Sequence, residues 1–200
     1  MRRALLALAV LAVAGSGGCA GPRVRLPSAQ PTTEPAWRSM QAEHRVNVEF
    51  ATTEGKIERK ALRGAIAIER PGKLRLAALG PGGIRLFDLL LANGQVTVLY
   101  TFRAIEGSAF GAAIQSMAGD LGAAYLLEPA SPERAVEKDR DGESVTIKEP
   151  GRTVHLRRFV SARGLAVPTL IEAKTDKYQF VVDVVSVDVD QTLDPRLFSP

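Results

Sequence analysis

The chain has 200 residues, enough for one domain with a substantial apolar core, and a formal net charge of +4. Its 26 basic and 22 acidic residues are interleaved along the sequence, which argues against nucleic acid as a partner. The single cysteine excludes an intramolecular disulfide, so the fold must be stabilised by the burial of apolar side chains.

The first residues have the pattern of an exported protein. Arg2 and Arg3 precede an uninterrupted apolar run over residues 4–14, and small residues then lead to Cys19. A basic start, a short apolar core and a small-residue cleavage site predict a signal peptide over residues 1–18. Cys19, directly after that site, resembles the lipidated cysteine of bacterial lipoproteins, and we expect its lipid to anchor the chain to a membrane.

Two other interpretations of this segment are open. An ordinary signal peptide could be cut elsewhere, which would leave Cys19 incidental. A transmembrane helix needs about 20 apolar residues, and glycine interrupts this run at Gly15. Ser16 departs from the usual lipoprotein motif, in which Leu is commonest at that position. Ala20 stands where Asp typically retains such proteins in the inner membrane, so we expect the outer membrane, facing the periplasm.

A flexible tether and a single domain follow the cysteine. Residues 19–32 carry Pro, Ser and Gln without an apolar period and are predicted to tether a domain over residues 33–200. The next segment, residues 34–44, is predicted to form an N-terminal helix, because Pro35 suits a first turn. Large residues recur there at spacings of three and four: Trp37, Met40 and His44.

A period of two then replaces the helical spacing and predicts antiparallel strands with one wet and one buried face. These strands are expected at residues 46–50, 62–69, 73–76, 84–91, 96–101, 144–148, 153–160, 169–174 and 178–189. Asn93-Gly94 is the strongest hairpin signal, because both central residues of a type I′ turn need positive φ. Asp183 is out of phase with its strand, which predicts a bulge near Val184.

One helix interrupts the strands. Ser108 is placed to cap it, and its buried stripe is expected to consist of Phe110, Ile114, Met117 and Leu121. The pattern therefore predicts a mainly β (α+β) domain, in which a long antiparallel sheet has its concave face covered by an N-terminal helix and an inserted helix.

Catalytic and metal-binding patterns are not found. His44 and His155 lie near no Cys, Ser or carboxylate motif with nucleophile or metal-ligand spacing, and we expect them on a helix surface and a sheet surface. The loop at residues 80–83 joins two strands and lacks a phosphate-loop context. Asp183, Asp188 and Asp190 fit a solvated strand face. We therefore expect no enzyme activity, no metal and no cofactor.

Large apolar residues occupy both faces of the strand at residues 84–91. A curved sheet covered by helices can close as a solid core, which is the simpler expectation, or it can leave an apolar cavity suited to acyl chains. The candidate cavity residues are Trp37, Phe50, Leu76, Leu89, Phe102, Phe110, Ile114 and Met117.

The order of these elements resembles the LolA/LolB lipoprotein-carrier superfamily. The most similar stretch is KLRLAALGPGGIRLF at residues 73–87, continued by NGQVTV at residues 93–98. Residues 108–120 resemble the inserted helical segment of that superfamily. The closing DPRLF at residues 194–198 is like endings among its members.

The resemblance implies an unclosed β-barrel with helices as a lid over an apolar cavity that holds acyl chains of lipids or lipoproteins. Cargo would come from a periplasmic carrier protein and enter the membrane without covalent chemistry. A protruding loop with an exposed Leu assists insertion in the family's receptor. The corresponding loop here is Gly80, Pro81, Gly82 and Gly83, with Gly82 at the position of the Leu.

Two other functions are open besides lipoprotein localisation to the outer membrane. A non-enzymatic scaffold or assembly lipoprotein of the cell envelope would use the same fold for protein contacts and would carry no lipid. A hydrolase is the third, and it would depend on His44 or His155.

Lipidation at Cys19 has a direct test. We expect Cys19→Ser to move the protein from the membrane fraction to the soluble periplasm, because serine offers no thiol for the acyl group. Cell fractionation followed by immunoblotting measures the change. Unchanged membrane association of Cys19→Ser would refute lipidation as the anchor.

Overall fold

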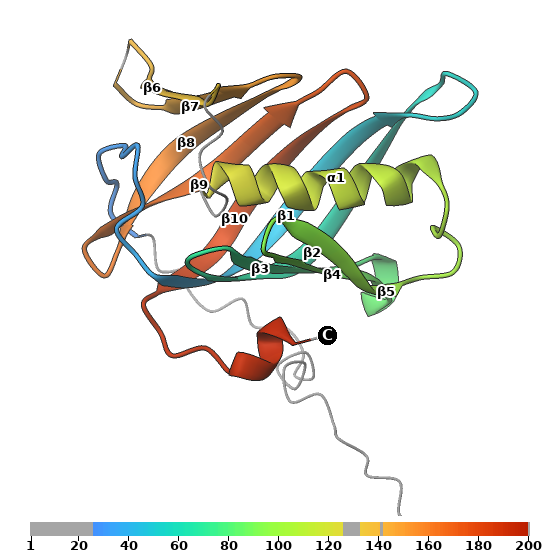
Figure 1. Cartoon of the computed structure of the whole chain (residues 1–200), viewed down its shortest axis with the longest axis horizontal. Helices are drawn as coiled ribbons and strands as arrows, with labels where there is room; N and C mark the ends of the chain where they lie inside the picture. The colour runs from blue at the N-terminus through green and yellow to red at the C-terminus, as the bar shows by residue number, and fades with distance from the viewer. Residues whose placement is uncertain (1–25, 126–132, 141, 200) are drawn as a thin grey trace, which may run out of the picture.

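The computed structural model describes residues 26–125, 133–140 and 142–199, so the predicted signal peptide and Cys19 lie outside the described residues. The described chain forms one large antiparallel sheet with an α-helix against its concave face (Figure 1). The strands are β1 (Ser39–Ala51), β2 (Ile57–Glu69), β3 (Lys73–Leu79), β4 (Arg85–Ala92), β5 (Gln95–Thr101), β6 (Ala135–Lys138), β7 (Val145–Glu149), β8 (Arg152–Ala162), β9 (Leu165–Lys174) and β10 (Tyr178–Val189). The helix is α1 (Ala109–Ala124), and two 3₁₀ turns are η1 (Pro81–Gly83) and η2 (Pro195–Phe198).

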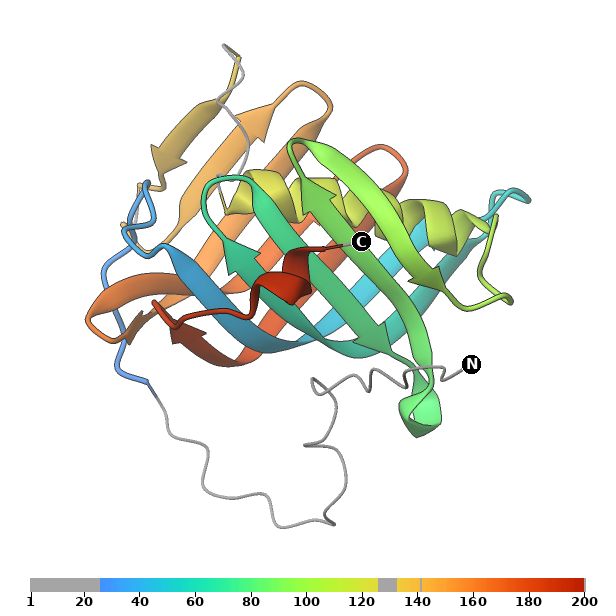
Figure 2. The same ribbon diagram turned by 60° about the horizontal axis from the view of Figure 1, so that its bottom comes forward.

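The sheet is open, as predicted for a mainly β, unclosed barrel. Its strand order is β5-β4-β3-β2-β1-β10-β9-β8-β7-β6, so β5 and β6 are edge strands that do not pair with each other. Each half of the sheet is a meander of sequential hairpins. The sheet curves around α1, which lies along its inner face in both views (Figures 1 and 2).

The two meanders meet where β1 pairs with β10. Their register runs from Met40 opposite Val189 to Phe50 opposite Tyr178. It shifts between Glu43 and His44, where β10 has one extra residue, Val185. This irregularity confirms the predicted bulge near Val184.

The N-terminal helix expected at residues 34–44 is wrong, because β1 begins at Ser39. From Met40 to Phe50 the buried side chains alternate with exposed or, at Glu49, half-buried ones, and Ala42 and His44 belong to the buried set. The spacing of Met40 and His44 fits two strand periods as well as one helical turn. Pairing with β2 and β10 on both sides decides in favour of the strand.

His44 is therefore a core residue and not the helix-surface residue that the sequence suggested. Its side chain is 2% exposed and lies on the inner face of β1, opposite Gly64 of β2. Neither ring nitrogen has a hydrogen-bond partner among the described residues. Burial lowers the pKa of His44 to about 4. His155 is half-buried in β8, with its Nδ1 2.9 Å from the hydroxyl of Thr146.

Two local signals in the sequence are confirmed. Asn93 and Gly94 join β4 to β5 with φ angles of 52° and 74°, as a type I′ turn requires. Ser108 caps α1, because its hydroxyl accepts a hydrogen bond of 3.1 Å from the backbone N–H of Gly111.

The outer face of β3 is covered by the segment that follows β10. η2 lies across this face, opposite α1 (Figure 2). Arg75 of β3 donates a 3.0 Å hydrogen bond to the carbonyl of Leu197 and a bidentate pair, of 2.9 and 2.6 Å, to the carboxylate of Asp88. Arg85 also contacts this carboxylate, which is 1% exposed.

The described end of the expected tether lies against the sheet. The backbone N–H of Ala29 donates to the carbonyl of Phe159, and the N–H of Ser161 donates to the carbonyl of Pro27. Residues 27–29 therefore follow β8 before the chain turns toward β1.

The buried imidazole of His44 predicts acid sensitivity. The unfolded chain takes up this proton near the ordinary pKa of 6.5, whereas the folded chain takes it up only near 4, so acid favours unfolding. We expect the contribution of His44 to the free energy of unfolding to be fully present above pH 6.5. It should fall by about 3 kcal/mol as the pH is lowered from 6.5 to below 4.

Urea unfolding at several pH values, compared between the wild type and His44→Leu, isolates this contribution from those of the carboxylates. The His44→Leu curve should be flatter between pH 6.5 and 4. Parallel curves for the two proteins would contradict the assignment.

Candidate ligand-binding cavity

A cavity of about 310 Å³ lies between the N-terminal half of α1, the inner face of β4 and β5, and the loop that joins β5 to α1. This volume is at the lower end of the range of small-molecule sites, which begins near 300 Å³. Its lining consists of Phe87, Leu89, Val98, Thr101, Ile105, Glu106, Gly107, Ser108, Gly111, Ala112, Ile114 and Gln115.

The base of the cavity is apolar and buried, whereas its mouth is at the β5 edge of the sheet. Phe87, Leu89 and Ile114 are each 1% exposed and form the base. Val98 lies opposite Leu89 in the ladder, yet its side chain is 41% exposed, because β5 is an edge strand. The cavity therefore changes from dry to solvated across the width of two strands.

Small residues on α1 keep this space unfilled. Ala112 and Gly111 present little side chain to β4 and β5 where a leucine would fill the gap. Gly111 also allows a close approach, since a Cβ there would lie 2.5 Å from the carbonyl oxygen of Ile105. The hydroxyl of Ser108 donates a 2.6 Å hydrogen bond to that same carbonyl. The loop is thus fixed against the first turn of the helix.

The other half of α1 is anchored to the opposite side of the sheet. Asp120 is 4% exposed, and its carboxylate accepts a 2.9 Å hydrogen bond from Arg152 of β8. It also accepts a hydrogen bond from the hydroxyl of Tyr178 of β10. Burial and then this bond raise the pKa of Tyr178. Asp120 thereby sets the distance of α1 from the sheet at one end, and the cavity lies at the other end.

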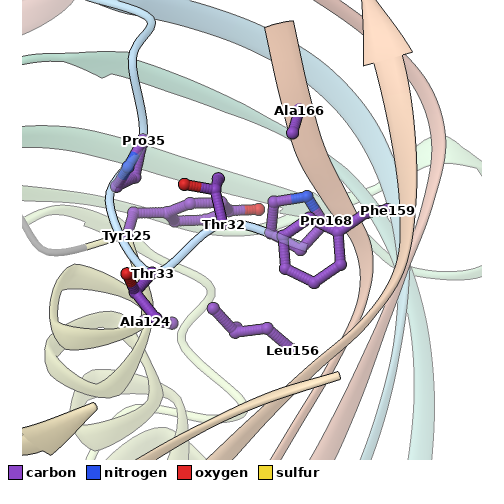
Figure 3. A pocket seen from close by; sticks show the side chains of 9 residues that line it. All are labelled: Thr32, Thr33, Pro35, Ala124, Tyr125, Leu156, Phe159, Ala166 and Pro168. Atoms are coloured by element: carbon purple, nitrogen blue, oxygen red, sulfur yellow. The ribbon is translucent and has the colours of Figure 1, made fainter. Parts of the chain in front are cut away.

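A second hollow lies where α1 ends, and it has only about 10 Å³ (Figure 3). The Tyr125 hydroxyl points toward Pro168 and Phe159 there, and it has no hydrogen-bond partner among the described residues. Burial raises the pKa of Tyr125. A space this small holds at most a water molecule, so it is not a ligand site.

The candidate cavity residues fall into two groups. The structure places Leu89 and Ile114 in the cavity lining. The other buried ones fill the core: Phe50 packs on Phe110 at 5.4 Å between ring centroids, Trp37 meets the ring of Tyr125 edge-on at 5.9 Å, and Leu76 and Met117 are fully buried. Phe102 is half-buried just after β5.

Sequence reasoning missed the contributions of β5 and of the loop before α1. Val98 could have been found, because the Asn93-Gly94 hairpin fixes it opposite Leu89. The loop residues Ile105 and Glu106 had no sequence signal, since their position depends on how residues 102–108 return to the helix.

In the loop expected to face a membrane, Gly82 and Gly83 are exposed. Residues Pro81–Gly83 form η1, and Gly82 and Gly83 have φ angles of 70° and 77°. A Cβ at Gly82 would meet no atoms within 4 Å, but the positive φ would cost a leucine there about 1 kcal/mol in backbone strain. The large apolar side chain that this loop exposes is Ile84, at 52%.

Two further kinds of site were sought in the described ranges. No group of three or more His, Cys, Asp or Glu residues is arranged there to hold a metal ion. In the same part of the chain, no helix has the length and apolar character needed to cross a membrane.

No protein-family model and no curated protein matches this chain. Among solved structures it is similar to a LolA superfamily protein from Nitrosomonas europaea, with a TM-score of 0.48, 10% identity, and coverage of 84% of this chain and 93% of the other. It is also similar to a putative outer membrane lipoprotein-sorting protein domain from Vibrio parahaemolyticus, with a TM-score of 0.44, 7% identity, and coverage of 83% and 91%. A DUF1329 family protein from Desulfovibrio piger has a TM-score of 0.35, 12% identity, and coverage of 82% and 90%.

The anchor of α1 predicts a large loss of stability on mutation. Asp120→Ala removes the acceptor that Arg152 and Tyr178 share, and Arg152 keeps only its other partners, such as Glu149. Because a buried hydroxyl and one side of a buried charge pair lose an acceptor, we expect the free energy of unfolding to fall by about 2 kcal/mol. The matched control is Asp183→Ala, which breaks an Asp–Arg pair with both side chains more than two-fifths exposed. That pair should contribute less than about 1 kcal/mol. Equal losses in chemical denaturation would refute a special role for Asp120.

Proposed function

We propose that this protein binds an acyl chain of a lipid or lipoprotein in the cavity between α1 and the β4–β5 edge. In this proposal it is lipid-anchored through Cys19 at the outer membrane, faces the periplasm and takes part in lipoprotein localisation. The observation that carries the proposal is the cavity itself, with a buried apolar base and a mouth at a sheet edge.

Binding would need no covalent step. Transfer of an acyl chain from water onto Phe87, Leu89 and Ile114 gains about 0.8 kcal/mol for each buried CH₂ group. A half-open cavity suits a chain that must also leave, because the mouth at Val98 lets the ligand slide out along β5. The small volume favours one chain at a time over a bundle of chains.

The loop at residues 80–84 has a place in this proposal. It ends the β3–β4 hairpin, and that hairpin also supplies Phe87 and Leu89 to the cavity. Exposed Ile84 gives the loop an apolar tip that could enter a bilayer next to the ligand. Delivery from a periplasmic carrier protein would then end at the membrane surface.

A scaffold function is the second candidate, and one observation favours it. β5 is an edge strand that exposes both Val98 and Tyr100, with Arg85 placed over the Tyr100 ring at 5.2 Å. Such an edge can accept a strand from another protein. This function predicts a stable cross-linked partner from the envelope and no bound lipid.

Filling the cavity tests the first candidate. Ala112→Phe places a ring in the mouth without disturbing the core, because Ala112 is exposed on α1. We expect the wild type to co-purify with lipid that mass spectrometry detects. Ala112→Phe should co-purify with about tenfold less lipid, because the ring takes the place of CH₂ groups that would otherwise be buried in the cavity.

The matched control is Ala61→Phe, at an exposed alanine of β2 outside the cavity, which should retain the lipid. No lipid in the wild type, or equal lipid in Ala112→Phe and Ala61→Phe, would rule out this cavity as the site.

A further inference from the structure

The polar groups that line the cavity are of two kinds, those that already have hydrogen-bond partners and those that have none in the described ranges. Ser108 and the N–H of Gly111 line the cavity but already bond to each other and to Ile105. By contrast, the side chains of Thr101, Glu106 and Gln115 make no hydrogen bond or ion pair within the described ranges. These three are half-exposed or exposed, so they lie at the mouth and leave the base apolar.

The charge at the mouth has one sign. Glu106 is the only charged residue among the described residues that line the cavity. Arg103 is on the same loop and exposed, but it does not line the cavity. Arg85 is directed to Asp88 and to the Tyr100 ring on the outer face of the sheet. A ligand whose chain fills the base therefore has its head group next to a carboxylate and two neutral hydrogen-bonding groups.

From this arrangement we propose that the site selects single-chain ligands by head-group charge: it accepts neutral or cationic head groups and disfavours anionic ones such as free fatty acids. This inference rests on the proposed function, because it concerns the head of the ligand whose chain occupies the same cavity. Glu106 repels an anion at the mouth, and Thr101 and Gln115 hydrogen-bond a neutral head such as an amide or a sugar.

The expected discrimination is modest, because the mouth is solvated. A single exposed carboxylate should change affinity by roughly three- to fivefold between a cation and an anion, and salt should reduce the difference. The neutral head group should bind between the two or close to the cation.

The experiment uses the full chain with Cys19→Ser, so that no anchor of its own competes for the cavity. Isothermal titration below the micelle concentration compares three probes that share a dodecyl chain: dodecyltrimethylammonium, dodecyl maltoside and dodecanoate. Each is titrated against the wild-type cavity, Glu106→Gln and Arg103→Gln. Ala112→Phe is added to show that binding occurs in the cavity.

We expect dodecanoate to bind roughly three- to fivefold more weakly than the cation, Glu106→Gln to remove this difference, and Arg103→Gln to leave the order of the three probes unchanged. Equal affinities in the wild type, or a preference that persists in Glu106→Gln, would overturn charge selection but leave acyl binding standing. If no probe binds, or if Ala112→Phe binds all of them as well as the wild type, the proposed function fails together with this inference.

Discussion

The pairing of β1 with β10 is the constraint on which the rest of this structure depends. It joins the first and last strands of the chain at the centre of the sheet and turns two independent meanders into one curved surface. The inner faces of both strands supply the middle of the core, including Val48 and Phe180. Without this seam, α1 would face half a sheet, and the two ends of the helix would have no common surface to rest on.

The cavity follows from how α1 is held on that surface. At its C-terminal half, Asp120 reaches β8 and β10, which are strands of the second meander. At its N-terminal half, the helix faces β4 and β5 of the first meander with Gly111 and Ala112. One helix therefore spans both halves of the sheet, with a polar anchor on one side and too little side-chain volume on the other. A cavity at the β5 edge is the space left by that asymmetry.

The sequence predicted most of the sheet because alternation and turn signals are local. A hairpin turn, a helix cap and a β-bulge each depend on a few neighbouring residues, and they were predicted from Asn93-Gly94, Ser108 and Asp183. The helix expected at residues 34–44 failed for the opposite reason, since His44 is compatible with both periods and only pairing with two distant strands selects one. The mouth of the cavity could not be predicted from the sequence either, because the position of Glu106 depends on the path of the loop between β5 and α1.

The turn η2 has a consequence for the outer face of the sheet. The strands of the described ranges are complete at Val189, yet the outer face of β3 is covered only by the segment that follows, in which Leu197 accepts its hydrogen bond from Arg75. Without η2, Arg75 would lose the carbonyl of Leu197 and the outer face of β3 would be open to solvent. η2 thus does for the outer face of β3 what α1 does for the inner face, because apolar surface left uncovered there would favour association with other molecules.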